Sequence, residues 1–122
     1  MTDSRRQVGR DGEALVVAQA RAWGWQVRAT NWRCRFGEID VIAQEGPCLV
    51  LAEVRTRRSE RRGTPEESVG PRKQRRLATL AEHYVQSVGW EGPWRVDVFA
   101  VVLGPDGRVA RLTHYPDALE GG

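Results

Sequence analysis

The chain has few of the side chains that usually build disulfide frameworks or zinc sites. Among its 122 residues there are two cysteines, Cys34 and Cys48, and two histidines, His83 and His114. Two lone thiols indicate neither a disulfide framework nor a zinc site. We therefore expect all four to be ordinary residues without a catalytic role.

Long hydrophobic runs are also missing. No apolar segment approaches the roughly 20 residues that span a bilayer, so we expect neither a transmembrane helix nor a membrane partner. Residues 1–13, MTDSRRQVGRDGE, lack the apolar core of a secretory signal. The hydrophobic content of 40% is nevertheless that of a globular chain. We therefore expect a single cytoplasmic domain over residues 1–122 with one modest core.

Lysine is the scarcest charged residue. The 19 basic residues are 18 arginines and one lysine, Lys73, and the net charge is +3. A basic chain is a weak indication of a polyanionic partner. The bias toward arginine matters for chemistry, because a guanidinium does not release its proton whereas an ammonium group can.

Hydrophobic periodicity predicts the order of the elements. Apolar residues at helical spacing predict a helix over residues 11–23, after a loose arm over residues 1–9, and a second helix from Pro71. The other segments are predicted as strands over residues 25–32, 94–103 and 109–115, a hairpin over residues 38–55, and a charged loop over residues 56–70. This order indicates an α/β or α+β fold with the hairpin in the middle of one mixed sheet.

Two carboxylates interrupt the apolar strands of the hairpin. If the turn is centred between residues 46 and 47, residues whose numbers sum to 93 face each other, so Asp40 lies opposite Glu53 and Glu38 opposite Arg55. Their Cβ atoms would be about 4.5–5.5 Å apart, and the two negative charges would repel. A divalent cation such as Mg²⁺ would relieve this, with the Val54 carbonyl as a further ligand. The plainer alternative is that Glu53 pairs with an arginine and Asp40 caps a turn.

Several short motifs carry a family resemblance between about Gly9 and Tyr115. They are GRDGE at residues 9–13, NWR at 31–33, GEID at 37–40, EVR at 53–55, Lys73, and RVD at 95–97. The acid, the hairpin spacer and the Glu-x-basic triplet resemble the PD-(D/E)xK nuclease motif. The whole chain is identified as a member of the YraN-like uncharacterised family, which is similar to archaeal Holliday junction resolvases.

The resemblance implies a restriction-endonuclease-like α/β fold, with a central mixed β-sheet flanked by helices in a single nuclease-like domain. It also implies that Asp40 and Glu53 ligate Mg²⁺ or Mn²⁺, and that Glu13 is an additional acidic site residue. Alternatively, Glu13 complements the dipole of a helix's first turn. The resolvases act as dimers, so a homodimer is expected by analogy.

One departure from the family pattern concerns Arg55, which stands where the family usually carries a lysine that positions or deprotonates the attacking water. Arginine cannot act as a base, but it can stabilise negative charge in the transition state. Lys73 is the available substitute, because it shares a helix face with Leu77 and is expected to face the sheet. Alternatively, Lys73 extends along the edge of the helix into solvent.

Basic residues cluster beside the predicted site and are candidates for nucleic-acid binding: Arg57, Arg58, Arg61, Arg62, Arg72, Arg75 and Arg76. Cations at a helix N-terminus are unfavourable unless anions lie nearby, although a solvated charged loop is the plain alternative. Arg95 and Asp97 are expected to form an internal salt bridge. We expect a metal-dependent nuclease that hydrolyses structured or branched DNA or, alternatively, a binding module on the same fold with weak or no cleavage.

Overall fold

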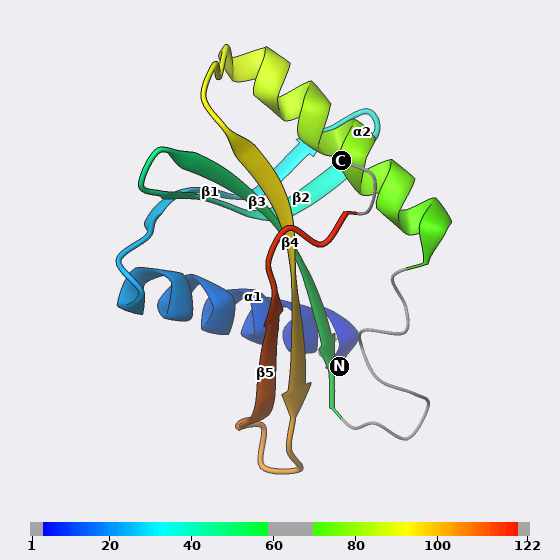
Figure 1. Ribbon diagram of the computed structural model, residues 1–122. Coiled ribbons are helices and arrows are strands. Elements are labelled where there is room, and N and C mark those ends of the chain that lie inside the picture. The colour runs from blue at the N-terminus through cyan, green and yellow to red at the C-terminus, as the bar shows by residue number, and fades with distance from the viewer. Residues whose placement is uncertain (1–3, 59–69, 120–122) are drawn as a thin grey trace.

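The computed structural model describes residues 4–58 and 70–119, which form two helices and one five-stranded sheet (Figure 1). Their elements are α1 (Ser4–Ala22), β1 (Gln26–Cys34), β2 (Gly37–Glu45), β3 (Cys48–Arg57), α2 (Pro71–Val88), β4 (Trp94–Leu103) and β5 (Val109–Tyr115). The strands lie in the order β1-β2-β3-β4-β5. Among them β3 and β4 are parallel, joined through α2, and the other neighbours are antiparallel. The predicted α/β fold with a mixed central sheet is therefore confirmed.

The two helices cover opposite faces of the sheet (Figure 1). On one face, Val16 of α1 packs in a cluster with Val50 and Phe99. On the other, Leu77 and Leu80 of α2 pack in a cluster with sheet residues that include Leu51. Because both faces are covered, β3 is apolar on both sides, as its LVLA run indicates. Neither helix in the described part of the chain is long and apolar enough to cross a membrane.

Helix α1 begins well before the predicted start. The prediction of a loose arm is wrong for residues 4–9, which lie in α1, while residues 1–3 lie outside the described part. Val8 is buried and lies four residues before Gly12 and eight before Val16, on one stripe of the helix. The burial of Val8 against the core cluster offsets the low helix propensity of Gly9 and Gly12.

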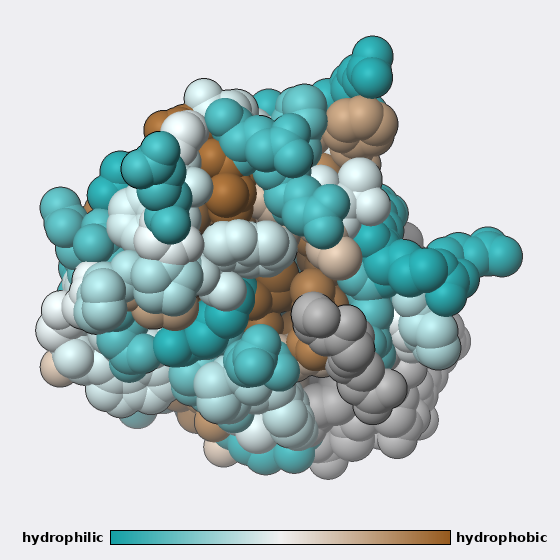
Figure 2. All heavy atoms as spheres, turned by 45° about the horizontal axis from the view of Figure 1, so that its top comes forward, coloured by the Kyte–Doolittle hydropathy of each residue, from teal (hydrophilic) through white to brown (hydrophobic). Residues whose placement is uncertain are grey.

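The space between α2 and the sheet holds a small pocket beside the predicted site. Figure 2, in which the α2 side of the molecule comes forward, shows hydrophobic side chains at the floor of a recess framed by hydrophilic groups. The pocket is lined by apolar residues and one carboxylate: Ile39, Leu51, Ala52, Glu53, Leu77, Ala81 and Val96. Glu53 thus projects from β3 toward α2.

Candidate metal centre

Strands β2 and β3 diverge at Asp40. Their ladder keeps the predicted register, from Glu45 opposite Cys48 to Val41 opposite Ala52, and that part of the prediction is confirmed. The backbone pairing ends there, and the Val54 N–H donates instead to Asp40 Oδ2 at 2.8 Å. The Asp40 side chain therefore takes the place of a ladder hydrogen bond, where two strands open a fork in the sheet.

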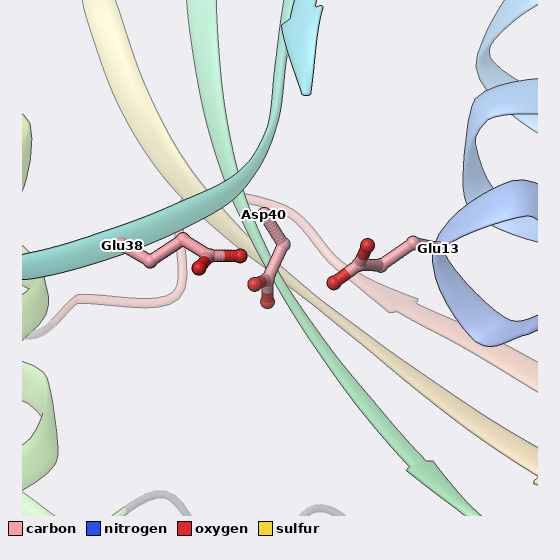
Figure 3. Close-up of side chains that lie close together, drawn as sticks. All are labelled: Glu13, Glu38 and Asp40. Atoms are coloured by element: carbon pink, nitrogen blue, oxygen red, sulfur yellow. The ribbon is translucent and has the colours of Figure 1, made fainter. Parts of the chain in front are cut away.

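The alternation of side chains along β2 also breaks at this point. Ile39 belongs to the cluster under α2 and Val41 to the cluster under α1, although residues two apart in a regular strand share a face. The ribbon of β2 bends at Asp40 (Figure 3). The bend lets the Asp40 carboxylate meet the Glu13 side chain, which comes from α1.

Three carboxylates converge at the fork. Glu13 from α1 and Glu38 and Asp40 from β2 point toward one another (Figure 3), and one oxygen of each lies within 4.8 Å of the others. Glu13 stands in the middle of α1, so the alternative that it complements a first-turn dipole is wrong. Glu38 does not pair with Arg55 as the sequence suggested, but with Arg33 of β1 at 2.9 Å.

Asn31 bridges two of these carboxylates. With its amide nitrogen turned toward the acceptors, the Asn31 side chain donates to Glu13 Oε2 at 3.0 Å and to Glu38 Oε1 at 2.7 Å. Its backbone is left-handed, with φ 53°, a conformation that asparagine tolerates better than most residues. A neutral donor thus holds together two like charges from α1 and β2.

The electrostatics of the cluster favour protonation. The pKa of Asp40 is raised from 3.8 to about 8, first by burial and then by the charges of Glu53, Glu13 and Glu38, against the hydrogen bond from Val54. Burial likewise raises the pKa of Glu13, although the hydrogen bond from Asn31 opposes the rise. Burial and the neighbouring negative charges thus favour the protonated form of these carboxylates.

The two cationic side chains predicted at the site, Arg55 and Lys73, contact Glu53 rather than the carboxylate cluster. Glu53 is 7% exposed, and its Oε1 lies 3.2 Å from Arg55 Nη2 and 3.5 Å from Lys73 Nζ. Lys73 therefore faces the sheet, as predicted from its position on the helix. The Arg55 Nε is buried without a hydrogen-bond partner in the described part of the chain. One feature of the plainer alternative is therefore present, an arginine on Glu53, whereas Asp40 accepts from the Val54 N–H of strand β3 instead of capping a turn.

The predicted Arg95–Asp97 pair is an internal salt bridge, as expected. Asp97 is fully buried and accepts from Arg95 Nε at 2.9 Å and from the Asp117 N–H at 2.9 Å. His114 Nε2 lies 2.7 Å from the same carboxylate, and its ring stacks on Phe99. These residues join β4 to β5 and its following turn, so His114 has a structural role outside the carboxylate cluster.

The structure describes five of the seven arginines that are predicted to bind nucleic acid. Arg58, Arg72, Arg75 and Arg76 are exposed and Arg57 is half-buried, whereas residues 61 and 62 lie outside the described ranges. Helix α2 begins at Pro71 without an acidic residue in its first turn, so its basic residues have no intrahelical partner there. The arrangement leaves positive charge on the surface at both ends of the chain segment between β3 and α2.

A glycine in α1 sets how closely Glu13 approaches the sheet. A methyl group at Gly12 would overlap the Thr56 hydroxyl and lie 2.9 Å from Thr56 Cβ. We expect Gly12→Ala to destabilise the protein by about 1–3 kcal/mol, the usual cost of overpacking. Urea unfolding of the parent and the variant measures this change in the free energy of unfolding. Gly9→Ala is the matched control, since that position has open space, and should stabilise by about 0.5–1 kcal/mol. Equal stabilisation by both variants would contradict the close contact.

The residues that sequence reasoning missed are Glu38 and Asn31. Glu38 precedes Asp40 by two positions in the GEID motif, and this spacing could have placed both carboxylates on one side of the strand. Asn31 lies between Thr30 and Trp32, which pair with Val41 and Ile39, so the register of β1 and β2 brings it beside Asp40. That register depends on a bulge in β1, which no motif in the sequence indicates.

The donor set fits a hard divalent cation. It consists of carboxylate oxygens, which suit Mg²⁺ and Mn²⁺, with no thiolate or imidazole in the cluster that the described residues form. A bound cation would offset the repulsion by Glu53, Glu13 and Glu38, which adds to burial in raising the pKa of Asp40. Glu53 on the adjacent strand raises the pKa of Asp40 through its charge, whereas the carboxylates whose oxygens lie within 4.8 Å of one another are those of Glu13, Glu38 and Asp40.

Comparison with known proteins places the chain among uncharacterised bacterial proteins. Residues 12–101 match the uncharacterised protein family UPF0102. A UPF0102 protein of Symbiobacterium thermophilum is 50% identical over 105 residues, covering 85% of this chain and 89% of the relative. One of Moorella thermoacetica is 46% identical over 111 residues, with 90% and 92% covered. One of Pelotomaculum thermopropionicum is 39% identical over 120 residues, with 98% and 100% covered.

Proposed function

We propose that this chain, which belongs to the UPF0102 family, is a metal-dependent nuclease that hydrolyses phosphodiesters of structured or branched DNA. The family match confirms the predicted membership of the YraN-like family. The observation that carries the proposal is the convergence of Glu13, Glu38 and Asp40 at the fork between β2 and β3. The kinship with restriction-endonuclease-like enzymes and Holliday junction resolvases is part of the same proposal.

The carboxylates have distinct roles in this proposal. Asp40 and Glu53 lie on the two strands of the fork and are the principal ligands for Mg²⁺ or Mn²⁺, with the Val54 carbonyl as a further oxygen. Glu13 and Glu38 complete an acidic pocket that attracts the cation and can hold a water molecule. A bound divalent cation supplies a Lewis acid for the phosphate and lowers the pKa of a water ligand.

The two cations on Glu53 supply the remaining chemistry. Arg55 can donate hydrogen bonds to the phosphate oxygens and so stabilise the charge that develops there. Lys73 projects from α2 to the same Glu53 oxygen. It is therefore positioned to orient the attacking water or to accept its proton, which Arg55 cannot do.

The test is a cleavage assay on branched, flapped and linear DNAs of one sequence, with Mg²⁺, with Mn²⁺ and with EDTA. We expect divalent-dependent cleavage of the structured DNAs and none in EDTA. A specific observation favours a second candidate, a nucleic-acid-binding module without efficient cleavage, because Arg55 occupies the position of the family's lysine. Tight binding without cleavage under any metal would make this second function the better one.

Basic residues around the chain segment between β3 and α2 are expected to supply the affinity. Replacement of Arg57, Arg58, Arg61 and Arg62 by alanine should weaken DNA binding and flatten its dependence on salt, because fewer counterions are released. Binding titrations at several salt concentrations measure both effects. A quadruple variant with the parent's affinity and salt slope would show that DNA lies elsewhere on the protein.

A further inference from the structure

An exposed aromatic ring stands on the turn between β1 and β2. Phe36 is 41% exposed, although its ring is held in place. It packs edge-on against His83 of α2, with ring centroids 5.2 Å apart and an interplanar angle of 76°. Trp32 contacts His83 and also packs edge-on against the buried Tyr84. The exposed ring is therefore the outer member of a row of rings that is anchored in the core.

Arginines surround this ring. The Arg35 guanidinium lies 4.8 Å from the centroid of Phe36. Arg76 reaches from α2 across the turn, so that its Nη2 lies 3.1 Å from where a side chain on Gly37 would begin. Among residues 4–58 and 70–119, neither Arg35 nor Arg76 has a carboxylate partner. Their charges are therefore available to an anionic ligand.

The turn is continuous with the carboxylate cluster. Phe36 precedes Glu38 by two residues and Asp40 by four, so its Cα atom lies at most about 14 Å from that of Asp40. Arg33, on the other side of the turn, is paired with Glu38. A chain molecule that places one phosphate at the cluster would extend onto Phe36 and its arginines.

We propose that Phe36, with Arg35 and Arg76, is a stacking platform for one unpaired nucleobase next to the phosphate at the carboxylate cluster. The inference rests on the proposed nucleic-acid substrate and names its class, DNA with an unpaired nucleotide beside the site. Aromatic rings stack on bases of any sequence, and arginines bind the flanking phosphates. A paired base cannot reach the ring, because it is stacked within the duplex. On binding, the base displaces Arg35 from the exposed ring.

The test measures binding in EDTA, so that cleavage plays no part. The probes are a single strand, a flap and a fully paired duplex of one sequence, each with 2-aminopurine at the junction position. We expect the parent to quench 2-aminopurine in the flap and single strand but not in the duplex. Phe36→Ala should lose this quenching and bind the flap about fivefold to a hundredfold more weakly, the effect of one lost base–aromatic stack.

Two further variants separate stacking from folding. Phe36→Leu keeps an apolar side chain against His83 but has no aromatic face, so it should fold like the parent and bind like Phe36→Ala. Phe36→Trp should restore the quenching. If Phe36→Ala and Phe36→Leu bind and quench like the parent, or weaken duplex and flap equally, the platform is refuted and the ring serves another partner.

Different experimental results would refute the stacking platform and the proposed nuclease function. A parent that cleaves flaps with Mg²⁺ while the Phe36 variants bind and quench unchanged would keep the nuclease and refute the platform. A parent that cleaves nothing, but loses flap affinity and quenching on Phe36→Ala, would keep the platform and refute the nuclease.

Discussion

Asp40→Asn is expected to abolish both the metal response and DNA cleavage, while it stabilises the metal-free protein at pH 8. The parent should gain stability from Mn²⁺ because a ligand that binds only the folded state raises the free energy of unfolding. The variant should lose this gain, since an amide replaces the central carboxylate of the cluster. Calorimetric titration with Mn²⁺ and urea unfolding with and without Mn²⁺ measure the two effects.

The pH dependence of the metal-free protein follows from the same carboxylate. The pKa of Asp40 is raised from 3.8 to about 8 in the folded state, mainly by burial. Between these two values the folded state binds more protons than the unfolded state, so the free energy of unfolding falls as the pH rises through this window. Since each pKa unit corresponds to about 1.4 kcal/mol, the loss amounts to a few kcal/mol. Asp40→Asn should show a weaker pH dependence over the same range, to which Glu13, whose pKa is also raised, still contributes.

The control for this prediction is an acid outside the cluster. Glu91→Gln removes an exposed carboxylate between α2 and β4 and should change neither the Mn²⁺ response nor the pH profile. In Asp40→Asn the amide oxygen can still accept the Val54 N–H, so the fork between the strands is retained. Undiminished Mn²⁺ binding by Asp40→Asn, or a parent whose stability rises from pH 5 to pH 8 in EDTA, would refute the assigned metal centre.

Most of the fold could be predicted from the sequence, because hydrophobic periodicity and turn residues are local features of the chain. Strands β4 and β5 have the predicted bounds, and α2 begins at the predicted proline. The early start of α1 was missed, because two glycines and few apolar residues obscure the helical pattern that the burial of Val8 completes. Local propensity is a weak guide wherever tertiary packing decides the outcome.

Only some of the contacts in the candidate site could be predicted from the sequence, for a related reason. Glu53, Arg55 and Lys73 could be placed by alternation and helical spacing, and the contacts of Glu53 with the two cations bear this out. The grouping of Asp40 with Glu13 and Glu38 depends on the bend in β2, which changes the face on which side chains emerge. The influence of Glu53 on Asp40 could be predicted from the hairpin, whereas the neighbours that the bend brings to Asp40 could not.

Arg55→Lys is expected to accelerate cleavage. Arg55 lies beside Glu53, where it can stabilise charge but cannot accept a proton. A lysine there is a compact charge that can lose its proton in a partly buried site near a metal. General-base assistance is typically worth about 10²–10⁴-fold. The gain is expected to be smaller if Lys73 already provides part of it. Single-turnover cleavage of a branched DNA with Mg²⁺, measured across pH, gives the comparison.

Variants of Lys73 show whether charge or proton transfer is the important property at that position. Lys73 Nζ and Arg55 Nη2 both lie against Glu53 Oε1, at 3.5 and 3.2 Å. If Lys73 only neutralises Glu53, Lys73→Arg should retain activity. If Lys73 handles the proton of the attacking water, Lys73→Arg and Lys73→Ala should both abolish the parent's activity, and Arg55→Lys should restore it in either background. No gain from Arg55→Lys, together with full activity in Lys73→Ala, would exclude both cations from the proton chemistry of cleavage. No cleavage by the parent or by Arg55→Lys, together with tight DNA binding, would leave the binding module as the better function.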